Sequence, residues 1–104
     1  GGVGGRNQQF ALACAELISG SDITVLSAGT DGIDGNSPAA GAVVDGSTLN
    51  RISDRTKVDA SGNDEVRHAL STFNAYPLFD ALGDAVVTGP TGNNLRDLRI
   101  LLAY

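Results

Sequence analysis

Three short segments of the sequence concentrate residues that could act on an anionic small molecule. The segment 27–35 reads SAGTDGIDG and holds two carboxylates, Asp31 and Asp34, among three glycines. A carboxylate can act as a general base or hold Mg²⁺ during phosphoryl transfer, and glycine lets a backbone approach a ligand closely. The alternative is an ordinary connecting turn in which both aspartates are solvated.

The second segment is a glycine loop at the start of a helical pattern. Gly4 and Gly5 precede Arg6 and Asn7, so free backbone N–H groups and a guanidinium would face one anion. Arginine suits bidentate binding of a carboxylate or phosphate. The dinucleotide fingerprint G-x-G-x-x-G fails because Asn7 stands at the third glycine position, and the Gly-Lys-Ser/Thr of a P-loop is absent. A flexible terminus with an exposed arginine is the alternative.

The third segment, 88–94, reads TGPTGNN. Its hydroxyls, amides and backbone N–H groups would make a neutral polar cradle, although a simple turn is the commoner origin of such a sequence. Elsewhere, His68 stands beside Arg67 on the charged side of a helical pattern, and Cys14 lies in an alanine-rich one. We therefore expect a surface histidine and a core cysteine, and no catalytic role for either.

The apolar pattern predicts the elements that would position these segments. Helices are expected at 6–19, at 38–44, after Ser47, at 64–72 and at 76–82; strands are expected at 22–28, 84–88 and 97–103. The first helix is expected to bury Phe10, Ala13, Cys14, Leu17 and Ile18. This alternation predicts an α/β protein, a three-layer α/β/α domain with a small mixed sheet. A buried strand that opens into a glycine-rich acidic loop is where such folds place their chemistry.

Length and composition limit the size and the partners of the chain. Its 104 residues suffice for one domain. The net charge of −5 and the lack of a basic stripe argue against nucleic acid or an anionic membrane as the partner. No apolar run approaches the ~20 residues that span a bilayer, and no signal peptide is visible, so a cytoplasmic location is expected. The glycine-rich start and the lack of methionine suggest a piece of a longer protein.

Taken together, the segments resemble a known family. GGRNQ is followed by LSAGTDGIDG, then by AAGAVVDG, and then by ALGD-x-VVTGPTG-x-N-x-x-DLR. This series resembles the MOFRL domain, the C-terminal part of the glycerate 2-kinase family, some of whose members are labelled hydroxypyruvate reductases. The resemblance covers essentially the whole chain.

The resemblance implies a transferase that moves the γ-phosphate of ATP to the 2-hydroxyl of glycerate with Mg²⁺. In the family, the cleft lies between a Rossmann-like N-terminal domain and this one. Residues 1–104 would then be a single MOFRL-like domain without that N-terminal domain, so we expect no turnover from the chain alone.

The resemblance also implies roles for individual residues. Arg6 resembles the family's substrate- or phosphate-binding arginine. Asp31 resembles its acidic cleft residue, as base or orienter of the glycerate hydroxyl, with Asp34 the alternative. We assign Arg6 and Asp31 as catalytic and leave the metal ligands open. Binding contacts are expected from Gly4, Gly5, Asn7, Thr30, Gly32, Asp34, Thr88, Gly89, Thr91, Gly92 and Asn94.

Two other functions stay open at this point. One is an NAD(P)H-dependent hydroxypyruvate reductase, and the other is a free-standing binding module without chemistry. A domain that docks on another exposes an apolar patch or a sheet edge, so we also expect a two-fold homodimer. Finally, we expect segments 4–7, 30–35 and 88–94 to meet at one edge of the domain.

Overall fold

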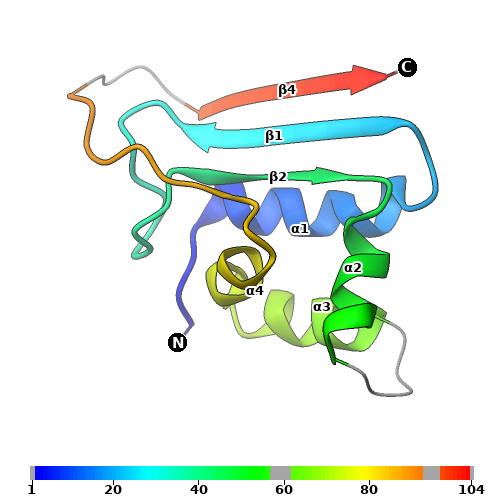
Figure 1. Cartoon of the computed structure of the whole chain (residues 1–104). Helices are drawn as coiled ribbons and strands as arrows, with labels where there is room; N and C mark the ends of the chain where they lie inside the picture. The colour runs from blue at the N-terminus through cyan, green and yellow to red at the C-terminus, as the bar shows by residue number, and fades with distance from the viewer. Residues whose placement is uncertain (1, 57–61, 93–96, 104) are drawn as a thin grey trace.

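The computed structural model describes residues 2–56, 62–92 and 97–103. Its elements are α1 (Arg6–Ile18), β1 (Ile23–Gly29), β2 (Gly41–Asp45), α2 (Thr48–Thr56), α3 (Gly62–Ser71), α4 (Ala75–Leu82), β3 (Ala85–Val86) and β4 (Asp97–Ala103). The strands form one sheet in the order β3-β2-β1-β4, and β4 lies at the edge farthest from α2, α3 and α4 (Figure 1). The α/β class expected from the sequence is confirmed.

Strand β1 forms where its apolar run predicts a strand and lies inside the sheet, whereas the strands expected beside it at the centre, 84–88 and 97–103, form the two edges as β3 and β4. It pairs with β2 along one edge and with β4 along the other. All three strand pairs are antiparallel, in place of the expected mixed pairing. The register sets Gly29, the last residue of β1, opposite Asp97, the first residue of β4. The loop after β1 and the start of β4 therefore lie at the same end of the sheet.

Strand β2 lies where the sequence pattern predicts a helix at 38–44, so that prediction is wrong. The alanines and the Ser-Pro pair favour a helix locally. The β-branched Val43 and Val44 instead pair with Leu26 and Val25 of β1. Strand formation depends strongly on such cross-strand partners. The local pattern does not report them, and tertiary pairing overrides it.

One hydrophobic core joins the four helices to one face of β1 and β2. Helix α1 contributes Ala11, Leu12, Ala15 and Ile18 to it. The expected buried face of α1 is thus partly wrong: Leu17 is 85% exposed and Ala13 is exposed. Phe10 and Cys14 are half-buried against the core. None of the helices in the described ranges is long and apolar enough to cross a membrane.

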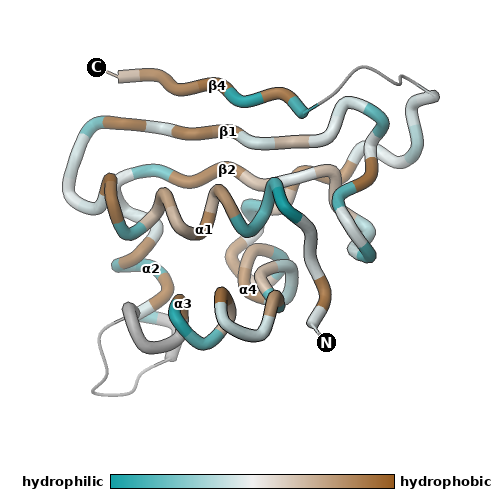
Figure 2. The backbone as a smooth tube through the Cα atoms, turned by 180° about the vertical axis from the view of Figure 1, so that it is seen from behind, coloured by the Kyte–Doolittle hydropathy of each residue, from teal (hydrophilic) through white to brown (hydrophobic). Residues whose placement is uncertain are grey.

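Strand β4 is exposed along nearly its whole length. Leu98, Ile100 and Leu102 lie on the face opposite the core and are 42–50% exposed. Figure 2 shows hydrophobic colour along both β4 and β1. Within the described part of the chain, the second edge of β4 pairs with no strand. An edge of this kind, apolar and unpaired, is a site for association with another chain.

The β1–β2 hairpin gives a stability test. We expect Gly41→Ala to lower the free energy of unfolding by about 2–3 kcal/mol, a typical cost of overpacking. The reason is that an added Cβ would overlap the carbonyl oxygen of Ser27 in the neighbouring strand. Gly4→Ala is the matched control, because its Cβ meets the Ala75 nitrogen at an ordinary 3.4 Å. Urea denaturation measures both, and equal losses in the two variants would contradict the role of Gly41.

Candidate functional site

A buried carboxylate from the 27–35 segment caps α1. Asp34 is 2% exposed. Its two oxygens accept hydrogen bonds from the backbone N–H groups of Asn7 at 3.0 Å and Gln8 at 2.9 Å. The side-chain amides of the same two residues donate to it at 3.3 and 3.0 Å. Gly5 at the N-cap has no side chain to do this, so a distant loop supplies the cap and faces the positive end of the helix dipole.

This cap changes the expected role of the α1 N-terminus. The N–H groups of the first turn were expected to bind an anionic ligand, but Asp34 already accepts from two of them. Asn7 is 1% exposed, so its side chain is also an internal group. Asn7 and Asp34 are thus buried and hydrogen-bonded to each other, and the ligand contacts expected from them stay a prediction.

Arg6 projects from the first turn of α1 and pairs with Asp97 at the start of β4. Its Nε lies 2.6 Å from one Asp97 oxygen, and its Nη2 donates to the other at 3.2 Å. The Asn7 side chain donates to the same carboxylate at 3.0 Å. The hydrogen bond from Asn7, with a smaller contribution from Arg6, lowers the pKa of Asp97 below its ordinary value. Asp97 is therefore a charged partner for Arg6 at neutral pH.

The Asn7 amide is the junction of a polar network beneath this pair. Its Nδ2 donates to both Asp34 and Asp97, and its Oδ1 accepts a hydrogen bond from Ser27 at 2.7 Å. Arg99 donates to Ser27 at 3.4 Å, and its guanidinium stacks 4.0 Å from the Phe10 ring.

The predicted site residues did not include four members of this network, Gln8, Ser27, Asp97 and Arg99, although Gln8 stands in the GGRNQ motif and Ser27 begins the segment 27–35. A signal for Ser27 existed, because it is a polar residue that directly follows the apolar run of the predicted strand. Asp97 and Arg99 were visible only as part of the DLR motif.

The segment after β3 reaches the loop after β1. Thr91 donates through its backbone N–H to the Asp31 carbonyl at 3.0 Å and through its hydroxyl to the Thr30 carbonyl at 2.6 Å. Gly32 has φ +86°, and a Cβ there would overlap the carbonyl oxygen of Gly89. Only glycine fits this close approach. Thr88 and Gly92 are exposed beside these contacts, whereas Asn94 lies outside the described residues.

All three sequence segments thus meet at one end of the sheet. The start of α1, the loop after β1 and the segment after β3 lie together at the left of Figure 1. Asp97 connects the first two of these, because it holds Arg6 and is the register partner of Gly29, two residues before Asp31, and Thr91 joins the third to the same loop. Asp31 is half-buried, and one of its oxygens accepts from the Ile33 N–H at 3.0 Å. This end of the domain offers an exposed guanidinium, a half-buried carboxylate and glycine-rich backbone.

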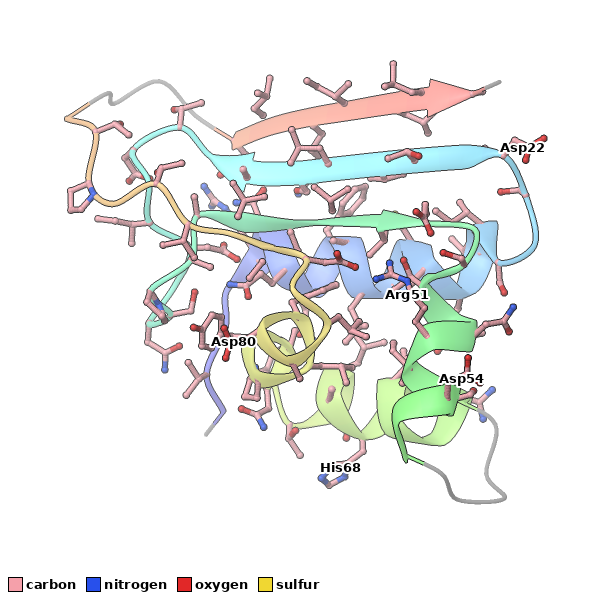
Figure 3. All side chains as sticks on the ribbon, viewed as in Figure 1. Asp22, Arg51, Asp54, His68 and Asp80 are labelled. Atoms are coloured by element: carbon pink, nitrogen blue, oxygen red, sulfur yellow. The ribbon has the colours of Figure 1, made fainter. Side chains whose placement is uncertain are left out.

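The other titratable candidates lie apart from this end. The His68 side chain is exposed and points away from the body of the domain in Figure 3, as expected. Burial raises the pKa of the Cys14 thiol, the opposite of what a nucleophile needs. Arg51 instead pairs with Asp84 at 2.7 Å beside β2.

Comparison with known proteins identifies the family. Residues 1–97 match the model of the MOFRL family. The chain belongs to this family. It is 42% identical to a D-glycerate 2-kinase of Thermotoga maritima, over 95% of this chain and 22% of that protein. It is 44% identical to an Agrobacterium vitis protein named as a candidate hydroxypyruvate reductase, over 97% of this chain and 22% of that protein.

A solved structure agrees with the sequence comparison. The crystal structure of a glycerate kinase from Thermotoga maritima superposes with a TM-score of 0.87 at 37% identity. That match covers 100% of this chain and 24% of the other. This MOFRL chain therefore spans between a fifth and a quarter of the length of these relatives.

The Asp34 cap gives the second test. We expect Asp34→Asn to lower the free energy of unfolding by about 3 kcal/mol, because the amide loses the charge and turns N–H groups toward buried donors. Asp31→Asn keeps the acceptor for the Ile33 N–H, so the change expected is below about 0.5 kcal/mol. Thermal and urea unfolding of both variants would expose an error if Asp34→Asn proved as stable as Asp31→Asn.

Proposed function

We propose that this chain forms one wall of a glycerate 2-kinase active site. The complete enzyme would transfer the γ-phosphate of ATP to the 2-hydroxyl of glycerate, and an N-terminal domain outside this chain would supply the other wall. The observation that carries the proposal is the meeting of three distant segments at one end of the sheet, with Arg6 and Asp31 on them. The names of the kinase relatives supply the reaction class.

Arg6 has the chemistry to bind the anionic part of the substrates. Its side chain is 76% exposed although it pairs with Asp97. A guanidinium presents five N–H donors and binds a carboxylate or phosphate through two of them. In the proposed site, Arg6 binds the glycerate carboxylate or the phosphate in transfer, and the segment 89–92 contacts the loop after β1 through Thr91.

Asp31 is the proposed base or orienter of the glycerate 2-hydroxyl. One oxygen of its carboxylate is fixed by the Ile33 N–H, and in the described residues no group donates to the other. Its carbonyl is held by Thr91, so the loop around it is anchored twice. Asp34 was the alternative, but its burial and four hydrogen bonds leave no oxygen for a substrate. Positioning of this kind is the main requirement of phosphoryl transfer.

The described side chains do not make up a complete Mg²⁺ site. Among the side chains that the structure describes, those of 2–54, 66–92 and 97–103, no three from Asp, Glu, His or Cys lie close enough together to hold a metal ion. The α1 N-terminus is also closed to a phosphate, because Asp34 occupies it. The proposed share of this chain is therefore to bind glycerate and to handle the hydroxyl proton, and ATP with its Mg²⁺ would be held chiefly by the other domain.

A reductase acting on hydroxypyruvate is the second candidate, and the name of the Agrobacterium vitis relative favours it. The failed dinucleotide fingerprint weighs against cofactor binding by this chain. Asn7, at the third glycine position, is buried in the network with Asp34 and Asp97. Any nicotinamide cofactor would have to be held by the other domain.

The reaction is tested with the product of the complete gene. We expect ATP- and glycerate-dependent release of ADP, and Asp31→Asn should lower kcat about 10²–10⁴-fold, the range for loss of a general base. Asp22→Asn is the matched control because Asp22 is exposed and lies at the opposite end of β1 (Figure 3). A coupled ADP assay measures the kinase reaction, and NADH absorbance with hydroxypyruvate measures the reductase reaction.

Two results would contradict the proposal. Hydroxypyruvate-dependent oxidation of NADH without glycerate phosphorylation would favour the reductase. Full kinase activity in Asp31→Asn would remove that residue from the mechanism. The 104-residue chain by itself is expected to be inactive, because half a cleft cannot hold both substrates in line.

We further propose that the 104-residue chain forms a two-fold dimer through the free edge of β4. Ile100→Lys should weaken this association, because charge on an edge strand opposes strand pairing. Leu17→Lys, at an exposed apolar position on α1, is the matched control. Sedimentation at micromolar concentration measures the oligomeric state of the wild type and both variants, and a monomeric wild type would refute the dimer.

A further inference from the structure

The guanidinium of Arg6 has one edge in use and one edge free. Asp97 takes the side edge, formed by Nε and Nη2, with contacts of 2.6 and 3.2 Å. A guanidinium is planar, so fixing this edge also fixes the direction of the end edge formed by Nη1 and Nη2. In the described part of the chain, Nη1 has no partner. The arrangement leaves a two-donor edge of known direction on an exposed side chain.

The carboxylate of Asp97 is itself held in place. The Asn7 amide donates to it at 3.0 Å. That amide is fixed in turn, because Ser27 donates to its oxygen and Asp34 accepts from its nitrogen. Asn7 is 1% exposed, so the network beneath the pair is buried even though Arg6 is not.

Stability alone does not account for this arrangement. An ion pair with one partner as exposed as Arg6 contributes little to folding, because water screens it and ordering a long side chain costs entropy. Positioning has a much larger effect on catalysis, where a misplacement of about 1 Å can lower the rate about 100-fold. The network is thus better explained by the direction that it gives to Arg6.

We propose that Asp97 is a positioning residue for Arg6, which it turns so that the Nη1 and Nη2 edge receives the carboxylate or phosphate oxygens of the substrate. This inference rests on the proposed function for the identity of that substrate. Asp97 also affects which anions Arg6 binds. Its negative charge offsets most of the unspecific attraction between Arg6 and anions that do not fit the Nη1 and Nη2 edge.

The kinetic test uses a double-mutant cycle in the complete gene product. Asp97→Asn leaves the positive charge on Arg6 but releases its direction. We expect kcat to fall about 100-fold while KM for glycerate changes less than about threefold. In the Arg6→Gln background the same substitution should lower kcat less than about threefold further, because Asp97 acts through Arg6. Asp22→Asn again serves as the control for the loss of one negative charge.

A second measurement does not depend on turnover. With ¹⁵N-arginine-labelled protein, titration with D-glycerate or inorganic phosphate should shift the Nη signals of Arg6 and leave its Nε–H signal in place. In Asp97→Asn, both signals should shift. Arg6→Gln assigns the signals by removing them.

The outcomes separate this inference from the kinase proposal. If the protein phosphorylates no glycerate but the Nη signals shift selectively, the kinase proposal fails and the role of Asp97 stands. If the kinase is active and Asp97→Asn lowers kcat equally with and without Arg6, the role of Asp97 fails alone. A shift of the Nε–H signal in the wild type, or no shift of any Arg6 signal, also overturns it.

Discussion

The hydrogen bonds between Asp34 and the first turn of α1 are the constraint on which the rest of the site depends. A helix N-terminus leaves backbone N–H groups without partners, and Gly5 has no side chain to cap them. Asp34 meets this need from the loop after β1, with both oxygens shared between Asn7 and Gln8. The glycine loop and the acidic loop are thereby fixed against each other. Without this carboxylate, the first turn of α1, which carries Arg6, would lose its cap.

A buried polar layer extends from Asp34 to the surface. The Asn7 side chain accepts a hydrogen bond from Ser27 in β1 and donates one to Asp97 in β4, so it connects α1 to both strands. Buried polar groups are tolerated when they are hydrogen-bonded, and among the described side chains of this layer only the Gln8 Oε1 is buried without a partner. Helix α1 therefore buries two amide side chains near its start and an apolar stripe after them. The polar part fixes the site, and the apolar part forms the core.

The sequence predicted what depends on local pattern. The limits of α1, the central place of β1 and the strand character of β4 follow from apolar periodicity and flanking turn residues. It did not predict β2, because the alanines of 39–42 favour a helix locally. The residues that pair with β2 lie in β1, so the local pattern gives no sign of them. Nor did it predict the burial of Asn7 and Gln8, because their partner Asp34 is a loop residue and the local pattern gives no sign of the contact. The meeting of segments 4–7, 30–35 and 88–92 was expected only from the resemblance of the whole series of motifs.

The pairing of Arg6 with Asp97 joins residues 91 positions apart. Arg6 has its partner only when the last strand is docked beside β1. The entropic cost of closing such a loop grows only slowly with its length, but contacts between distant residues slow folding. Because the described contacts of β4 are chiefly those with β1, this strand can open by itself while the core under α1 stays folded. Such an opening would release Asp97, so Arg6 would lose its partner before the core unfolds.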